Sequence, residues 1–302
     1  MEKHYKAVRN HKDTVFRLLF ADKKELLTLY NALNGTDYHD PQRLRMYTLE
    51  NAIYMNVKND VSFLLDAELN LYEQQSTYNP NMPLRNLIYI ARQLESYIRM
   101  ESIYSSKPVR IPVPRFVVFY NGTRKQPEQK ILRLSDSFEK EIAEPELELK
   151  VLMLNLGSGQ NKKLLEKCAT LKEYCLFVER IRSYAARLPL EEAVERAVTE
   201  CIRENILADF LIKQRSEVIA MSIFEYNEEE ELKKIRADER ELGKAEGKAE
   251  DILSLLEKLG PVPASLHERI MSETSLELLG QWLIDAARAD SVEAFAKRLP
   301  PS

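Results

Sequence analysis

The pattern of apolar and polar positions changes character about half-way along the chain. Up to about residue 160, short apolar runs of strand length alternate with segments whose apolar residues recur every three or four positions. Beyond that point the short runs disappear, and the three- and four-residue spacing of amphipathic helices continues to the end. The pattern therefore predicts a mixed α/β core followed by an all-helical C-terminal region.

The first 160 residues contain the elements of a sheet flanked by helices. Two short helices come first, and Gly35 ends the second of them. A longer helix is predicted from a cap at Asn81 to about Met100, with a proline in its first turn. The predicted strands are 44–49, 61–65, 69–72, 114–120 and 147–156. The strands at 61–65 and 69–72 are close enough to form a hairpin.

The second half divides into three helical parts. Long amphipathic segments at 165–188, 190–214 and 210–226 are followed by a highly charged stretch with the near-repeat GKAEGKAE. Several short amphipathic segments then reach the end of the sequence. We predict a core at 1–160, a helical extension packed on it at 161–227, a charged helical linker at 228–250 and a small helical domain at 251–302.

Composition narrows the class of protein. The chain has 302 residues, of which 44% are hydrophobic and 30% charged, and no apolar run approaches the ~18 residues that a membrane helix needs. The first residues are charged and lack the apolar segment of a secretory signal. Three cysteines form no CxxC motif and recur only at helical spacing, which indicates reduced thiols rather than a zinc site. We expect a cytoplasmic protein with no membrane partner.

Charge neither requires nor excludes a nucleic-acid partner. The net charge is −4, but residues 1–160 carry 22 basic against 20 acidic side chains, whereas residues 161–302 carry 22 against 28. The basic excess therefore lies in the predicted α/β core, and it is small.

Carboxylates and an amide bracket the predicted hairpin. Side chains alternate along a strand, so Glu73 and Gln75 project from one face about 6.6 Å apart. If the hairpin loop holds an even number of residues, Asp60 stands opposite Glu73 on the same face. Two carboxylates so placed repel each other unless a cation or a shared proton compensates, and a hard divalent cation takes such oxygen ligands. The stretch predicts a metal site suited to phosphodiester hydrolysis.

Other interpretations of these residues remain open at this point. Acidic residues at strand ends are commonly solvated, and a loop of odd length sets Asp60 opposite Gln74 instead. Ser76 and Thr77 lie next to the acidic pair, but the four histidines are scattered and none lies near in sequence, which argues against a serine hydrolase.

The same region resembles a known family. The segments "NDVSF", "YEQQSTYNPNMPLRNLIYIARQLESY" and "IPVPRFVVFYNG" are similar to the bacterial Rpn family of recombination-promoting nucleases, which are also described as transposases. That family belongs to the PD-(D/E)XK nuclease superfamily. The resemblance extends to the helical stretch from "YCLFVERIRSYAARLPLEEAVERAV" onward, the charged linker and the C-terminal helices.

The resemblance implies a PD-(D/E)XK-type mixed sheet flanked by helices and assigns roles to individual residues. Asp60 and Glu73 correspond to the two metal-binding carboxylates, and Gln75 stands where most of the superfamily has lysine. Because glutamine is neither a cation nor a base, activation of the water falls chiefly to the metal, and the catalytic role left to Gln75 is to orient the attacking water or to hydrogen-bond the phosphate. Asp13 corresponds to an early acidic residue of the site, although an Asp at the start of a helix is also a good N-cap. The implied metal is Mg²⁺, with Mn²⁺ or Ca²⁺ as alternatives.

The predicted function is that of a metal-dependent DNA endonuclease associated with recombination or mobile DNA. Arg85, Tyr89 and Arg92 share one face of the helix after the site and are candidates for contact with double-stranded DNA, unless Tyr89 packs and the arginines are solvated. Cutting both strands needs two sites, so we expect a homodimer through the helical C-terminal region. The alternatives are a DNA-binding transposition or recombination factor with little cleavage activity, and a non-catalytic interaction scaffold.

Overall fold

The structure is a computed structural model that describes residues 14–47, 60–98, 103–104 and 106–299, with only the backbone described for 96, 228–239 and 242. The chain divides into two compact units, Met1–Asn227 and Glu228–Ser302. The first contains a six-stranded sheet with helices, and the described part of the second contains helices only. The predicted mixed α/β core and helical C-terminal region are therefore confirmed.

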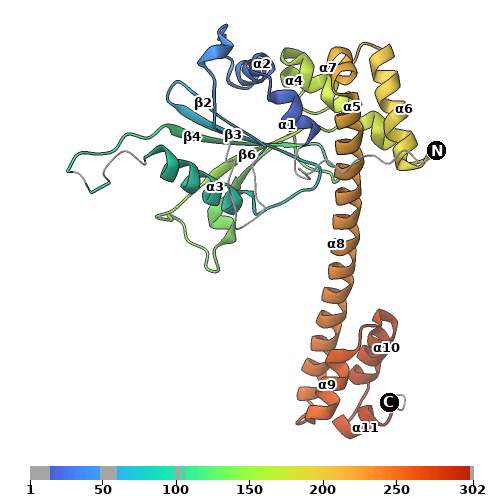
Figure 1. Cartoon of the computed structure of the whole chain (residues 1–302). Coiled ribbons are helices and arrows are strands. Elements are labelled where there is room, and N and C mark those ends of the chain that lie inside the picture. The colour runs from blue at the N-terminus through green and yellow to red at the C-terminus, as the bar shows by residue number, and fades with distance from the viewer. Residues whose placement is uncertain (1–13, 48–59, 99–102, 105, 300–302) are drawn as a thin grey trace. The chain divides into compact units, whose positions relative to one another are not determined.

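The sheet is mixed, with parallel strands at its centre (Figure 1). The order across it is β1-β2-β3-β4-β6-β5. β3, β4 and β6 are parallel to one another, whereas β1, β2 and β5 pair in the antiparallel sense. The strands are β1 Arg45–Met46, β2 Val61–Leu65, β3 Glu68–Gln75, β4 Val113–Tyr120, β5 Gln129–Arg133 and β6 Lys150–Asn155.

Sequence patterning missed one of these strands. β5 lies at the edge of the sheet and buries only Leu132, so its sequence QKILR shows no strong strand pattern. The two-residue strand β1 forms at the start of the run predicted at 44–49, and residues 48–49 lie outside the described part of the chain.

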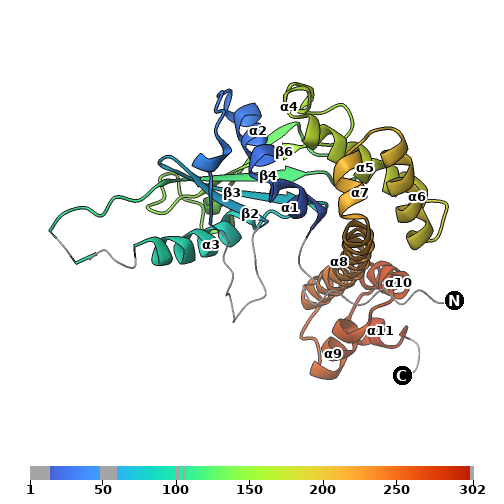
Figure 2. The same cartoon turned by 45° about the horizontal axis from the view of Figure 1, so that its top comes forward.

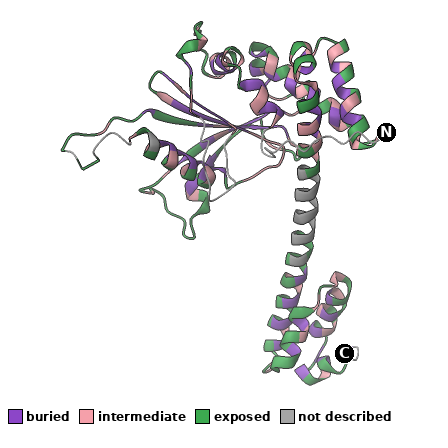
Figure 3. Ribbon diagram, in the orientation of Figure 1, coloured by how far each residue is buried: buried purple, intermediate pink, exposed green. Residues whose placement is uncertain are grey.

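Helices cover both faces of the sheet (Figures 1 and 2). α3 (Met82–Tyr97) packs on one face, where Tyr89 lies in a core with Leu71 of β3 and Val118 of β4. On the other face, α1, α2, α4 and α5 bury a second core that contains Phe63 and Tyr72. These helices are α1 Val15–Phe20, α2 Lys23–Asn34, α4 Lys162–Lys167 and α5 Ala169–Ala185. Figure 3 shows buried residues along the strands and on the helix faces that pack against them.

Two long helices predicted after residue 160 are each interrupted. The first breaks at Cys168, whose backbone is extended, and the second ends before Asn205 and Leu207, both of which have a positive φ. Leu207 is buried and its N–H donates to Glu173, so tertiary contacts favour a turn that the amphipathic pattern does not reveal. The helices that result beyond α5 are α6 Leu190–Arg203 and α7 Ala208–Lys213, and the short 3-10 turns of the first unit are Pro41–Arg43 and Leu134–Ser137.

The charged stretch predicted as a linker is helical. α8 spans Arg215–Glu257 and passes through it without a break. The alanines of the GKAE repeat, Ala245 and Ala249, are buried in the core of the second unit together with Trp282 and Phe295. Lys248 donates to the carbonyl oxygen of Leu276 at the start of α10. The remaining helices are α9 Ala264–Ser272, α10 Leu276–Ala287 and α11 Val292–Ala296.

The structure also bears on the expectations about membrane helices and cysteines. Within the described ranges, no helix is both long and apolar enough to span a membrane. All three cysteines carry free thiols; Cys168 and Cys201 are buried and Cys175 is partly buried.

Candidate functional site

The candidate site lies where the parallel strands end. Gln75, Tyr120 and Asn155 are paired across the carboxyl ends of β3, β4 and β6. In sheets with parallel strands and flanking helices, ligands bind outside these carboxyl ends. The start of β2 and the first turns of α3 meet the same edge, so five elements adjoin it.

The hairpin register places the two predicted carboxylates opposite each other. A two-residue turn, Asp66-Ala67, joins β2 to β3, and Asp66 adopts the left-handed conformation at φ 52° that Asp tolerates in turns. Val61 pairs with Tyr72, so the next position along this register sets Asp60 against Glu73. The even register is therefore the one the chain adopts.

Glu73 is a buried carboxylate that is only half satisfied. Its side chain is 4% exposed, and its Oε2 atom lies 3.4 Å from Nη2 of Arg85. Its Oε1 atom is buried and has no hydrogen-bond partner among the described residues. The pKa of Glu73 is raised to about 8, chiefly by burial; Arg85 lowers it, the nearby Asp60 raises it and Gln75 lowers it. A buried oxygen without a donor costs free energy unless a cation or a proton reaches it.

Asp60 is partly buried at the start of β2. Its Oδ2 atom accepts a 2.7 Å hydrogen bond from the backbone N–H of Gln74. Burial raises the pKa of Asp60 to about 6, although this N–H, Arg85, Arg17 and Thr14 all lower it. Two neighbouring carboxyl groups thus both hold protons more tightly than usual.

Thr14 and Arg17 connect α1 to the site. Thr14 is the N-cap of α1, and its hydroxyl accepts from the N–H of Arg17. The N-cap position that the sequence allowed for Asp13 is therefore occupied by Thr14. Asp13 itself lies outside the described residues, so its predicted role as a metal ligand stays a prediction.

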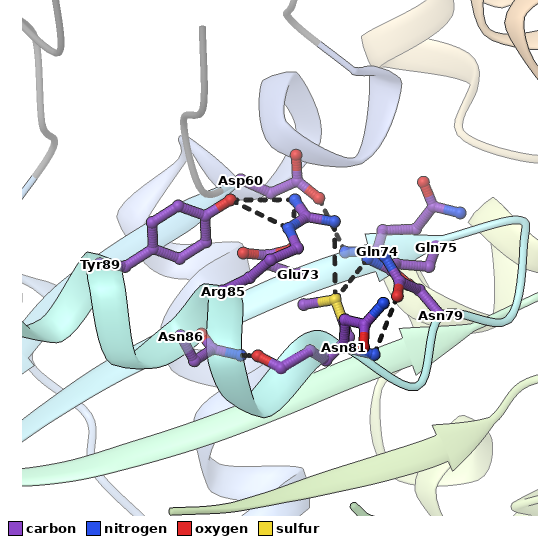
Figure 4. Close-up of polar contacts among 10 residues, drawn as sticks. Asp60, Glu73, Gln74, Gln75, Asn79, Asn81, Arg85, Asn86 and Tyr89 are labelled. Carbon is purple, nitrogen blue, oxygen red and sulfur yellow. Dashed lines mark hydrogen bonds and ion pairs between the residues drawn. The ribbon is translucent and has the colours of Figure 1, made fainter. Parts of the chain in front are cut away.

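Arg85 is the centre of the polar contacts in the site (Figure 4). Besides Glu73, its guanidinium donates to the hydroxyl of Tyr89 through Nη2 at 2.9 Å and Nε at 3.3 Å. With its amide oxygen toward the guanidinium, Gln75 accepts from Nη1 of Arg85 at 3.0 Å and donates to the carbonyl oxygen of Thr77 at 3.3 Å. Arg85 thus orients the Glu73 carboxylate through Oε2 and does not contact Oε1.

The structure separates the three residues predicted to contact DNA. Arg85 is 35% exposed and bound to Glu73, whereas Tyr89 is fully buried and supports Arg85 from behind. Arg92 is partly exposed further along α3 and makes no ion pair with any residue in the described ranges. Asp60, Glu73, Gln75, Arg85 and Tyr89 therefore form one cluster, which Arg92 does not join.

Sequence reasoning missed the residues that fix the strand ends beside the site. The side-chain amide of Gln74 bonds to that of buried Asn121 at 2.8 Å on the face opposite Glu73. Arg182 of α5 donates to the carbonyl oxygen of Asn121. The Asn121-Gly122 dipeptide is typical of a turn, but nothing in the sequence indicates the partners of Asn121. These contacts hold the two strand ends in register.

Gly122→Ala is expected to destabilise the first unit by about 2 kcal/mol, because forced overpacking costs this much in tight sites. A Cβ at this position lies 2.0 Å from the carbonyl oxygen of Ser76 and 2.6 Å from the Tyr120 ring, so the two strand ends have to separate. Urea denaturation measures the change. Gly243→Ala in α8, where a Cβ meets nothing within 4 Å, is the control and should be neutral or slightly stabilising. Equal stability of both variants contradicts the close approach.

The chain matches none of the family models, none of the curated proteins and none of the solved structures with which it was compared. The resemblance to the Rpn family thus rests on the sequence segments alone.

The residues present fit a divalent cation. Asp60 and Glu73 offer carboxylate oxygens, the ligands that Mg²⁺ prefers, and Mg²⁺ is commonly held by one or two carboxylates with water and phosphate in its other positions. The partnerless Oε1 of Glu73 is the atom that such an ion would satisfy. In the described part of the chain, no third Asp, Glu, His or Cys joins this pair.

Proposed function

We propose that this chain is a metal-dependent endonuclease of the PD-(D/E)XK type that hydrolyses phosphodiester bonds in double-stranded DNA. The observation that carries the proposal is the buried Oε1 of Glu73, which has no hydrogen-bond partner in the described part of the chain and lies beside a second carboxyl group of raised pKa. Two neighbouring carboxyl groups of this kind destabilise the fold when they ionise, so their presence indicates a functional role. Strongly perturbed pKa values of this kind concentrate at functional sites.

Each residue of the cluster has a distinct role in this proposal. Asp60 and Glu73 hold the cation, which when bound polarises the phosphoryl oxygen and lowers the pKa of the attacking water. Arg85 fixes the orientation of the Glu73 carboxylate, and its exposed edge is available to a phosphate oxygen. Gln75 and Tyr89 hold the guanidinium of Arg85 in that position. The roles of Gln75 and Tyr89 are to position Arg85, and neither needs to touch the DNA.

The proposal is tested by incubating the purified protein with supercoiled plasmid in Mg²⁺, Mn²⁺, Ca²⁺ or EDTA. Nicked or linear DNA is expected with Mg²⁺ or Mn²⁺, none is expected with EDTA, and Asp60→Asn is expected to abolish cutting. Cleavage that persists with EDTA, or in Asp60→Asn, refutes the metal mechanism.

The same assay separates the two alternatives. Retention of DNA in a gel without cutting under any condition supports a DNA-binding transposition or recombination factor. Absence of both binding and cutting supports an interaction scaffold. Both measurements need a titration of salt, because binding to phosphates weakens steeply as salt rises.

The proposal includes self-association through the C-terminal unit. Among the described residues of that unit, four large apolar side chains are more than a third exposed, and their burial in a dimer is favourable: Leu259, Met271, Leu278 and Ile284. Two copies supply two sites, one for each strand of the duplex. Linear plasmid that forms without prior accumulation of nicked circles supports paired sites.

A further inference from the structure

A second charged cluster lies on the loops beside the candidate site. Arg124, in the loop after β4, places its guanidinium carbon 5.5 Å from the centre of the Tyr78 ring. Lys130 of β5 places Nζ 5.0 Å from the same ring centre and donates to the Tyr78 hydroxyl at 2.9 Å. Arg124 and Lys130 are both exposed, as is Lys125 next to Arg124. We call Tyr78, Arg124, Lys125 and Lys130 the Tyr78 cluster.

Backbone contacts place the Tyr78 cluster at the same sheet edge as the acidic pair. The N–H of Asn121 donates to the carbonyl oxygen of Gln75, and Gly122 lies against the carbonyl oxygen of Ser76. The hydroxyl of Tyr120 donates to the carbonyl oxygen of Arg124, which ties the loop to the end of β4. The loops that carry Tyr78, Arg124 and Lys125 therefore leave the sheet side by side, directly after Gln75 and Tyr120, and Lys130 reaches Tyr78 from the start of β5.

The contacts within the Tyr78 cluster organise positive charge without neutralising it. An aromatic ring attracts a cation through the negative charge on its face, but it does not neutralise that cation. Among the described residues, none of the three basic side chains forms an ion pair with an acid, and the nearby Glu128 instead accepts from the backbone N–H of Asn161. Two cations on one ring repel each other, so an anion bound between them relieves the repulsion. The positive charge of the Tyr78 cluster therefore favours binding of an anionic ligand.

We propose that the Tyr78 cluster binds the phosphate backbone of the DNA on which the acidic pair acts. This inference deepens the proposed nuclease function and depends on it for the identity of the anion. DNA is favoured over an acidic protein because the Tyr78 cluster lies at the same sheet edge as Asp60 and Glu73. The backbone of a DNA strand bound at the acidic pair can therefore extend across the cluster. Both the face and the hydroxyl of Tyr78 already hold cations, which favours contact with phosphate over stacking on a base.

The proposal is tested by fluorescence anisotropy with a labelled DNA duplex in EDTA, where cutting is suppressed, over a range of salt concentrations. Arg124→Ala with Lys130→Ala is expected to weaken binding at least about tenfold and to flatten the slope of log affinity against log salt by about 2, since each lost phosphate contact removes about 0.9. Tyr78→Leu should weaken binding as well, because the cations lose their support, and Tyr78→Phe should weaken it less.

The matched control removes the same charge elsewhere. Lys172→Ala with Lys213→Ala changes exposed lysines on α5 and α7, and it should leave both the affinity and the salt slope unchanged. Equal effects of the two double variants, or no effect of Arg124→Ala with Lys130→Ala, overturn the proposal. Displacement of the duplex by polyglutamate at equal charge concentration also overturns it, in favour of an acidic protein partner.

The outcomes distinguish this inference from the nuclease itself. A wild-type protein that binds DNA through the Tyr78 cluster but never cuts refutes the nuclease and leaves the binding surface in place. A wild-type protein that cuts with Mg²⁺, beside a double variant that binds and cuts equally well, refutes the surface and leaves the nuclease.

Discussion

Glu73→Gln is expected to reduce DNA cleavage by about a thousandfold or more while making the metal-free fold more stable at alkaline pH. The loss of activity follows because an amide cannot replace a buried carboxylate as ligand of a divalent cation, and such an ion contributes several kcal/mol of transition-state stabilisation. The gain in stability follows from the pKa of Glu73, which burial raises from 4.5 to about 8. A variant that loses activity but gains stability shows that the ionised carboxylate serves function at the expense of the fold.

The sign of the stability change comes from proton linkage. Folded protein holds the Glu73 proton more tightly than unfolded protein does, so this group favours the fold below pH 4.5 and its contribution is lost as the pH rises through about 8. Glutamine does not ionise and removes this loss. At about 1.4 kcal/mol per pKa unit, and after allowance for the lost pairing with Arg85, the variant gains about 2 kcal/mol at pH 8.5 and little at pH 4.5.

Glu148→Gln is the matched control for Glu73→Gln. Burial raises the pKa of Glu148, but hydrogen bonds from Ser135, Leu134 and Leu149 outweigh it, so the pKa is lowered and the ionised form favours the fold. This control should lose stability above about pH 4.5 and keep full cleavage. Urea denaturation in EDTA at pH 4.5 and 8.5, with plasmid cleavage in Mg²⁺, measures both effects. Destabilisation by Glu73→Gln at every pH, or retained cleavage, contradicts the prediction.

The sequence could predict the acidic pair for a hairpin loop of even length, because hairpin geometry is local, but it left the length of the loop open. Side chains alternate along strands, and a two-residue turn at Asp66-Ala67 determines the register, so Asp60 and Glu73 oppose each other without any knowledge of the rest of the fold. The mixed α/β architecture followed from the change in apolar spacing near residue 160.

The position of Arg85 could not be predicted in the same way. Its spacing from Tyr89 indicates a shared helix face, but the contact with Glu73 depends on how α3 crosses back over the sheet after β3, and no local pattern encodes that path. The helix breaks at Cys168 and Leu207 were not predicted for a related reason. The amphipathic pattern continues through both positions, and tertiary contacts stabilise the breaks.

Binding of a divalent metal is expected to weaken by roughly 200-fold between pH 9 and pH 6. Carboxyl ligands must lose their protons before they bind a cation. With a pKa of about 8, Glu73 contributes close to a hundredfold over this range, and Asp60, with a pKa of about 6, contributes a further twofold at its lower end. Below pH 6 protons compete with the metal for both carboxylates, so the metal affinity falls more steeply with pH.

Calorimetric titration of Mg²⁺ or Mn²⁺ in two buffers of different ionisation enthalpy measures this prediction directly. Near pH 7 about one proton should be released for each metal bound, and the number should approach two near pH 5. A carboxylate pair with ordinary pKa values releases almost none at pH 7. Affinity that does not change between pH 6 and pH 9 therefore excludes Asp60 and Glu73 as the metal site.

Arg85 provides the variant that separates the electrostatic cause from simple loss of structure. Its positive charge lowers the pKa of both Glu73 and Asp60, so Arg85→Ala should shift the pH dependence of metal binding upward by about one unit and leave its shape unchanged. Arg85→Lys keeps the charge and should stay close to wild type in this measurement, although it cannot keep the forked contacts to Gln75 and Tyr89. A damaged site weakens binding at every pH, whereas a change in pKa is overcome by raising the pH. Recovery of metal binding by Arg85→Ala at pH 9 therefore assigns the effect of Arg85 to the charge it places beside Glu73, and failure to recover assigns it to the lost contacts.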